Sequence, residues 1–226
     1  MPASHLPGPA LVASPPLLYR ISRTARLLEP SRISPADARL PHAGNRFDVA
    51  GGGVLYFGST AQGCFAETLA RFRPTSAMRA IVADEDPRFV VCGGVPQDWR
   101  TQRQLVTVEA VDALAFVDVE HPDTHEYLTA ALASQLSVLG VAQLDVAVLR
   151  GSNRILTRTI STWAYAATNH DGTPKYSGIR YKSRLGDHEC WAVFDGTVLQ
   201  VRDRRPIELT DQDLQAVAAQ FGLRPF

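Results

Sequence analysis

The chain contains little cysteine, almost no lysine and no excess of charge of either sign. Its three cysteines, Cys64, Cys92 and Cys190, fit a reduced compartment better than a disulfide framework or a zinc site. Lysine plus arginine and aspartate plus glutamate number 23 each, so the formal net charge is zero. Because general nucleic-acid binders carry a basic excess, we expect no direct nucleic-acid partner. Only Lys175 and Lys182 are lysines, so nearly all positive side chains are arginines, which suit two-pronged binding of phosphates and carboxylates.

Segments typical of secreted or membrane proteins are also lacking. Residues 1–16 are rich in proline, but they have no basic start and no sustained apolar run, so they do not resemble a signal peptide. No stretch approaches the ~18 apolar residues that a membrane-spanning helix needs. We therefore expect a cytoplasmic protein without a membrane partner. Residues 1–16 are predicted to form a flexible Pro-rich arm, and residues 17–226 a single domain.

The sequence does contain many short strands and several helices. Apolar residues make up 45% of the chain, enough to bury a substantial core. Because the helices do not alternate regularly with the strands, the pattern predicts an α+β fold with antiparallel sheets. Helices are predicted from Ser59 or Thr60 to before Pro74, and over 122–139, 152–167 and 210–221, the last with a Thr210–Asp213 capping box. Strands are predicted over 17–21, 54–57, 78–82, 89–92, 104–108, 114–117 and 178–183, with a hairpin of 189–194 and 197–201 around Asp195-Gly196.

The stretch from Val54 to Pro74 predicts a strand followed directly by a helix. At helical spacing the apolar residues of this helix share one face, and Glu67 lies roughly 140° from the centre of that face. This single carboxylate has two interpretations. It either pairs with Arg71 on a solvated surface, or it is a functional group beside the strand end.

Motifs for several common site types do not fit. Gly51-Gly52-Gly53 lacks both the dinucleotide-binding glycine pattern and the phosphate-loop lysine, so a turn is favoured. His121 and His125 are four residues apart, but Pro122 intervenes, and the start of a helix is favoured over a zinc site. We expect no bound metal.

Five segments, taken in order, resemble the RES-domain family. The similarity runs from about residue 17 to residue 201 and so covers most of the chain. It implies an ADP-ribosyltransferase-like core of two small, mainly antiparallel β-sheets with flanking helices, as in diphtheria toxin. The segments are Leu18-Tyr19-Arg20-Ile21, Gly44-Asn45-Arg46-Phe47, Val54-Leu55-Tyr56-Phe57-Gly58-Ser59, Phe65-Ala66-Glu67-Thr68-Leu69 and Gly178-Ile179-Arg180-Tyr181-Lys182-Ser183-Arg184.

The resemblance also implies an activity and a site. Several family members are toxins of bacterial toxin–antitoxin pairs that destroy NAD⁺, and their partner is an antitoxin with an Xre-like DNA-binding region. The arginine, glutamate and serine of the family name correspond to Arg20, Glu67 and Ser183, which are the expected catalytic residues. Arg20, Arg46, Tyr56 and Ser183 are the expected substrate-binding residues. NAD⁺ is then a substrate, and no cofactor is expected.

Three functions stay open at this point. The first is cleavage of NAD⁺ by water or inorganic phosphate, the second is ADP-ribosylation of a macromolecule, and the third is nucleotide binding without turnover. Phe65 stands two residues before Glu67, where transferases often carry an acidic residue, and this favours a small acceptor. For a catalytic function we expect Arg20, Tyr56, Glu67 and Ser183 to line one cleft. The oligomeric state, including a homo-oligomer, is left open.

Overall fold

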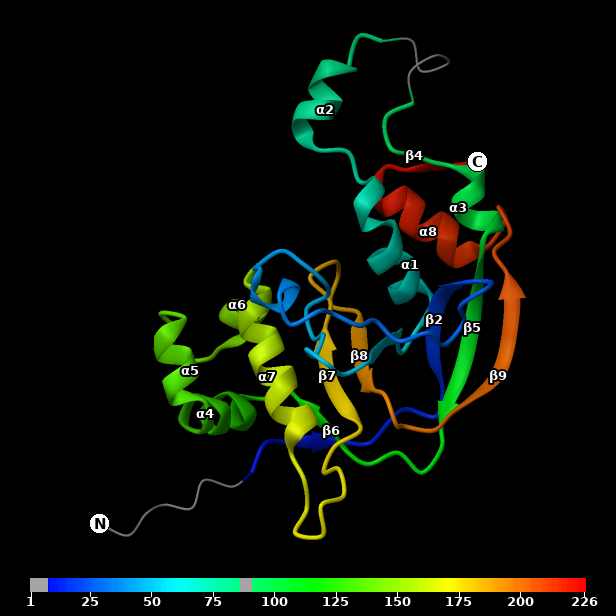
Figure 1. Ribbon diagram of the computed structural model, residues 1–226. Coiled ribbons are helices and arrows are strands. Elements are labelled where there is room, and N and C mark those ends of the chain that lie inside the picture. The colour runs from blue at the N-terminus through cyan, green and yellow to red at the C-terminus, as the bar shows by residue number, and fades with distance from the viewer. Residues whose placement is uncertain (1–7, 86–90) are drawn as a thin grey trace.

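One large curled sheet organises the molecule (Figure 1). The computed structural model describes residues 8–85 and 91–226. Eight strands follow the order β1-β6-β7-β8-β3-β2-β5-β9, and β10 and β4 form a separate two-stranded sheet. The strands are β1 (Leu11–Val12), β2 (Leu18–Arg23), β3 (Val54–Gly58), β4 (Gly94–Val95), β5 (Arg103–Ala110), β6 (Phe116–Asp118), β7 (Gly178–Lys182), β8 (Glu189–Phe194), β9 (Leu199–Pro206) and β10 (Arg224–Pro225).

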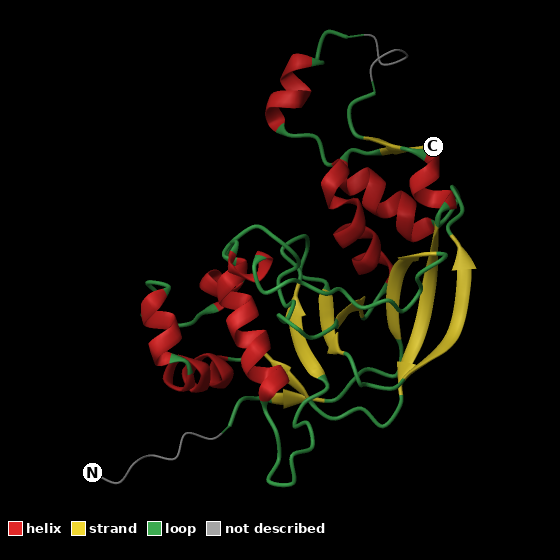
Figure 2. Cartoon of the chain, viewed as in Figure 1, coloured by secondary structure: helices red, strands yellow, loops and turns green. Residues whose placement is uncertain are grey.

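Helices pack against this sheet in two separate groups (Figure 2). The group α4 to α7 covers β6, β7 and β8, whereas α1, α3 and α8 cover β2 and β5. Side chains alternate between the sheet faces, so Leu105 packs with the second group while Val106 enters a core on the opposite face. The helices are α1 (Ala61–Leu69), α2 (Ser76–Ile81), α3 (Gln97–Thr101), α4 (Pro122–Ala131), α5 (Ala133–Val138), α6 (Val146–Leu149), α7 (Arg154–Ala166) and α8 (Gln212–Phe221), with short 3₁₀ turns at Asp37–Arg39 and Ala70–Phe72.

The sheet is nearly divided in two between β2 and β3. These strands pair at one position only, Tyr19 with Gly58, whereas β2 pairs with β5 over six positions. A Cβ at Gly58 would lie 3.0 Å from the Cys64 sulfur and 3.2 Å from the Thr60 carbonyl oxygen, so glycine lets α1 start close to the strand. The narrow junction leaves a five-stranded part, β1-β6-β7-β8-β3, and a three-stranded part, β2-β5-β9.

The predicted fold class is confirmed, with a different division into sheets. The protein is α+β, and its strand pairs are mainly antiparallel, apart from β6–β7 and β4–β10. Instead of two small sheets, one eight-stranded sheet is present beside a two-stranded one. The single contact between β2 and β3 explains the difference, because it joins what would otherwise be two smaller sheets.

Several local predictions are wrong. The hairpin of 189–194 and 197–201 does not form, because β8 pairs with β3 and β7 while β9 crosses to β5. Residues 78–82, predicted as a strand, lie largely in α2, whose first turn is capped by the Thr75 hydroxyl. The predicted helix over 122–139 is two helices, α4 and α5, that meet at Leu132.

Smaller differences from the predictions occur at both ends of the chain and around residues 89–92. Within the predicted flexible arm, Leu11–Val12 form β1 and pair with β6, while residues 1–7 lie outside the described residues. The predicted strand 89–92 also lies partly outside them. Helix α8 is capped by Asp211 rather than Thr210, and it ends at Gly222 with φ +64°, as predicted.

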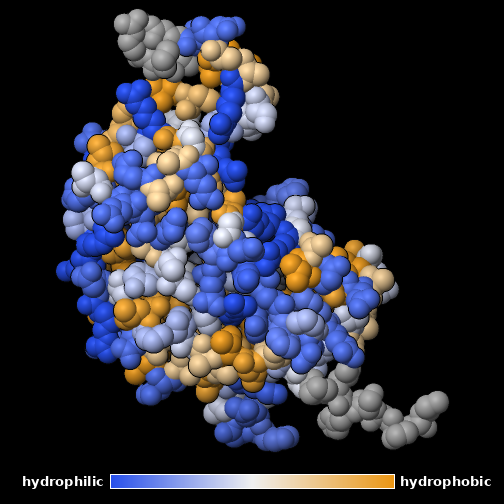
Figure 3. Space-filling model, turned by 180° about the vertical axis from the view of Figure 1, so that it is seen from behind, coloured by the Kyte–Doolittle hydropathy of each residue, from blue (hydrophilic) through white to orange (hydrophobic). Residues whose placement is uncertain are grey.

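A short extension that carries α2 projects from the second helix group. Met78 and Ile81 on it are 53% and 78% exposed, and hydrophobic surface is visible on this projection in Figure 3. Among the residues that the structure describes, no helix combines the length and the apolar character needed to cross a bilayer.

Candidate functional site

A cavity of about 530 Å³ opens where β2 and β3 separate. Its walls come from both strands, from α1, and from the long segment between β2 and β3. The residues that line it include Arg20, Arg46, Tyr56 and Glu67. Four of the five predicted site residues therefore meet in one cavity.

The cavity is strongly positive although the whole chain is neutral. Seven arginines line it against two carboxylates. Clefts lined by charge of one sign concentrate ligands of the opposite sign, so this one favours an anion. The arginines are Arg20, Arg23, Arg26, Arg46, Arg103, Arg154 and Arg184, and the carboxylates are Glu29 and Glu67.

Glu67 is oriented by Ser183, which is 116 residues further along the chain. Thr60 caps α1 through a 3.1 Å bond from the Gly63 amide, and this helix presents Glu67 to the cavity. The Ser183 hydroxyl donates to Glu67 Oε1 and accepts from the Leu185 amide at 2.9 Å. The amide thus leaves the hydroxyl proton free for the carboxylate.

This contact argues against the interpretation of Glu67 as a surface partner of Arg71. Within residues 8–85 and 91–226 no Glu67–Arg71 ion pair is present, and the Arg71 guanidinium instead lies over the Phe72 ring at 4.7 Å. Ser183 is 1% exposed and does not line the cavity itself. Its hydroxyl takes part by bonding Glu67 Oε1, which orients the carboxylate.

Arg20 and Arg46 reach the cavity with incomplete sets of partners. Arg20 donates from Nη2 to the Glu29 carbonyl oxygen at 3.2 Å, and Arg46 donates to the carbonyl oxygens of Leu149, at 2.8 Å, and Lys182. The Nε of each arginine is buried without a hydrogen-bond partner among the described residues. Burial lowers the pKa of both guanidiniums from their ordinary value, although arginine stays protonated at neutral pH. Both cations therefore retain capacity for an anionic ligand.

Tyr56 offers its ring to the cavity but not its hydroxyl. The hydroxyl donates to Asp48 Oδ1 at 2.8 Å and accepts from the Phe47 amide at 3.1 Å. Burial, and then the Asp48 charge, raise the pKa of this hydroxyl well above its ordinary value. Tyr56 consequently stays neutral, and only its aromatic surface is available for contact with a ligand.

Two thiols also line the cavity, which the sequence did not indicate. Cys64 and Cys190 are buried, and burial raises the pKa of Cys64 to about 12 and that of Cys190 further. Thiolates are the reactive form of cysteine, so neither residue is an activated nucleophile at neutral pH.

The two histidines considered as zinc ligands, His121 and His125, occupy structural positions. His121 caps α4 through a bond from the Asp123 amide, as expected for a helix start, and His125 Nε2 bonds the Val119 carbonyl oxygen at 2.8 Å. In the described part of the chain, no three His, Cys, Asp or Glu side chains are grouped to hold a metal ion.

The chain is an α+β protein with an arginine-lined cavity at the point where its large sheet is nearly divided. A family model described as the RES domain matches residues 17–215, so the chain belongs to the RES-domain family. The matched range contains all five predicted site residues. A search of curated proteins finds no match to this chain.

Proposed function

We propose that this protein degrades NAD⁺ by cleaving the bond between nicotinamide and ribose. One observation carries the proposal: Glu67 lies in an arginine-rich cavity and is oriented there by the Ser183 hydroxyl. The cavity volume of about 530 Å³ also falls in the ~300–1,000 Å³ range of small-molecule sites.

The chemistry of this bond suits a lone carboxylate. When the bond breaks, its electron pair moves to the nicotinamide nitrogen, so nicotinamide leaves as a neutral molecule without an acid. Positive charge develops on the ribose as an oxocarbenium-like state, which a carboxylate stabilises as in glycosidases. Glu67 supplies that charge, and Ser183 fixes one carboxylate oxygen while the other remains for the ribose.

The remaining site residues suit the rest of the substrate. A pyrophosphate carries two negative charges, and Arg20 and Arg46 line the cavity with guanidiniums that no carboxylate among the described residues pairs with. The nicotinamide ring is flat and cationic, so it is attracted to an aromatic face such as that of Tyr56.

A small acceptor completes the reaction. Water attacks the ribose carbon and loses a proton to solvent, giving ADP-ribose, or inorganic phosphate attacks and gives its phosphorylated form. Phe65, where transferases often have an acidic residue, is fully buried. This supports a small acceptor over a macromolecular one. A protein that consumes NAD⁺ in this way suits the toxin role of the family, with an Xre-type antitoxin as its partner.

The test is release of nicotinamide from NAD⁺ by the purified protein, with and without added phosphate. Glu67→Gln keeps the size of the side chain but removes its charge, so turnover should fall roughly 10²-fold or more. NAD⁺ affinity should change much less, because the arginine contacts persist.

Glu29→Gln is a matched control, since it removes the same charge from the other cavity carboxylate. The Glu29 side chain is 53% exposed and pairs with Arg26, so turnover should fall less than tenfold. Near wild-type turnover in Glu67→Gln would end its catalytic assignment. Absence of nicotinamide release from the wild type, with and without phosphate, would overturn the proposed function.

A further inference from the structure

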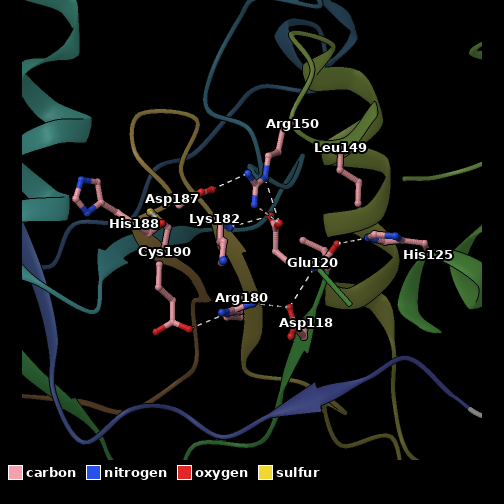
Figure 4. Close-up of polar contacts among 12 residues, drawn as sticks. Asp118, Glu120, His125, Leu149, Arg150, Arg180, Lys182, Asp187, His188 and Cys190 are labelled. Carbon is pink, nitrogen blue, oxygen red and sulfur yellow. Dashed lines mark hydrogen bonds and ion pairs between the residues drawn. The ribbon is translucent and has the colours of Figure 1, made fainter. Parts of the chain in front are cut away.

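A cluster of ion pairs surrounds the ends of β6 and β7 (Figure 4). In it Arg150 pairs with Glu120 and Asp187, and Arg180 pairs with Asp118 and Glu189. Its central residue is Glu120, which follows β6 and has a side chain only 9% exposed. Glu120 does not line the cavity, and no motif in the sequence distinguishes it.

Both oxygens of Glu120 are used, and they join two distant segments. Oε1 accepts from the Lys182 backbone amide at 2.9 Å, at the end of β7. Oε2 accepts from Arg150 Nε at 3.1 Å and Nη2 at 2.6 Å, just after α6. Glu120 therefore ties the segment after α6 to the end of β7, with one carboxylate oxygen on each.

Arg150 extends this attachment to the turn between β7 and β8. Its Nη1 donates to Asp187 Oδ1 at 2.7 Å. Asp187 has φ +58°, in the left-handed region that aspartate enters more readily than most side-chain-bearing residues. The same turn begins with Ser183, whose amide bonds the His188 carbonyl oxygen at 2.8 Å. The ion pairs therefore fix the turn that presents the Ser183 hydroxyl to Glu67.

The same two segments also hold Arg46. Its two terminal nitrogens bond the carbonyl oxygens of Leu149 and Lys182, which are next in sequence to Arg150 and Ser183. A shift between the segments would displace Arg46 and Ser183 together. Glu120 bonds both segments, so it helps to fix the positions of Arg46 and Ser183 at the same time.

We infer that Glu120 is a positioning residue, which acts through Lys182 and Arg150. It places the Ser183 hydroxyl against Glu67, and it places the Arg46 guanidinium in the cavity lining. The inference rests on the proposed function, because Glu67 and Arg46 are the groups assigned to the reaction. The negative charge of Glu120 is needed to hold Arg150. Without it, the one carboxylate partner left to Arg150 among the described residues is Asp187, whose side chain is 68% exposed. An exposed pair of this kind contributes little to order.

The experiment compares Glu120→Ala and Glu120→Gln by hydrogen exchange and by steady-state kinetics. In Glu120→Ala, the Lys182 amide loses its acceptor, so amides over 182–188 should exchange at least roughly tenfold faster than in wild type. Because small misplacements of reacting groups are costly, kcat/KM for NAD⁺ should fall on the order of 10–100-fold, through both kcat and KM. Glu120→Gln keeps an oxygen acceptor for Lys182 and should recover part of both effects.

Glu109→Ala is the matched control. Glu109 also binds an arginine through two nitrogens, since Arg202 Nε donates to it at 2.7 Å and Nη2 donates to the same oxygen, but it lies across the sheet on β5. Its removal should leave exchange over 182–188 and the KM for NAD⁺ unchanged.

Two outcomes would overturn the inference. One is unchanged exchange over 182–188 in Glu120→Ala, and the other is loss of active protein with the KM of the remaining enzyme unaltered, as plain destabilisation produces. Failure of the proposed function is seen separately, as a wild type that releases no nicotinamide, because the exchange measurement needs no turnover.

Discussion

The arginines of the cavity and those of the ion-pair cluster behind it differ in how they are partnered. Arg20 and Arg46 bond backbone carbonyl oxygens and keep a buried Nε unpartnered among the described residues. Arg150 bonds Glu120 and Asp187, and Arg180 bonds Asp118 and Glu189. Arg20 and Arg46 therefore lack carboxylate partners among the described residues, whereas each arginine of the cluster has two.

This difference separates ligand binding from scaffolding on physical grounds. A buried charge is costly unless it is paired, so a protein retains an unmatched one only where something else compensates it. In the cluster the carboxylates provide that compensation, whereas in the cavity the proposed function assigns it to the anionic pyrophosphate of NAD⁺. Removing Arg20 should accordingly weaken ligand binding, whereas removing Arg180 should mainly lower folding stability.

The largest effect that would test this comparison is expected at Arg20. Arg20→Gln removes charged hydrogen bonds to the ligand worth about 1.5–3 kcal/mol, so the Kd for NAD⁺ should rise roughly 10–100-fold. The melting temperature should not fall, since the lost charge had no carboxylate partner. Calorimetric titration in the Glu67→Gln background measures the Kd without consuming the ligand. Unchanged affinity with a lower melting temperature would place Arg20 with the scaffolding arginines.

At Arg180 a smaller effect is expected, on folding stability and not on NAD⁺ affinity. Its Nε lies 2.8 Å from Glu189 Oε1 and its Nη1 lies 3.1 Å from Asp118 Oδ1. Arg180→Gln leaves two partly buried carboxylates without their cation, so the free energy of unfolding should drop by about 1–3 kcal/mol. Denaturant titration measures this change, and turnover per folded molecule should remain at the wild-type level. A loss of NAD⁺ affinity at full stability would erase the distinction between the two groups of arginines.

Tyr56→Phe should give the smallest change in stability and in the KM for NAD⁺, and it tests whether the Tyr56 ring contacts the substrate. The substitution keeps the ring that faces the cavity and removes only the hydroxyl that bonds Asp48. Stability should fall by about 1 kcal/mol, the net value of a typical hydrogen bond, and the KM for NAD⁺ should stay within a few-fold of wild type. Tyr56→Leu, which removes the ring, should raise the KM further. Equal KM values in the two variants would exclude ring contact with the substrate.

The parts of the site that depend on local sequence could be predicted without a structure. A hydroxyl cap at Thr60, a nearby strand and helical periodicity are enough to place Glu67 off the apolar face of α1. Its association with Ser183 came from a family resemblance and not from periodicity, because the two residues lie on elements that only the tertiary fold brings together.

The predictions that failed required information from distant segments. Asp195-Gly196 has the chemistry of a hairpin turn, yet nothing near it indicates that the next strand will pair with β5. Glu120 looks like any acidic residue after a strand, and its importance comes from Lys182 and Arg150, which are far away in sequence. Side-chain burial and pairing of this kind are properties of the assembled sheet.

The strand order also limits how quickly the cavity can be completed during folding. Val54 pairs with Phe194 and Gln104 with Pro206, so long loops must close before these contacts can stabilise the chain, and such topologies fold in milliseconds to seconds. During synthesis at ~5–20 residues per second, the 116 residues that separate Glu67 from Ser183 take roughly 6–23 s to be made. Each nascent chain therefore carries its carboxylate without the serine that orients it for this interval. The bond between the Ser183 hydroxyl and Glu67 can therefore form only after both ends of this interval have left the ribosome.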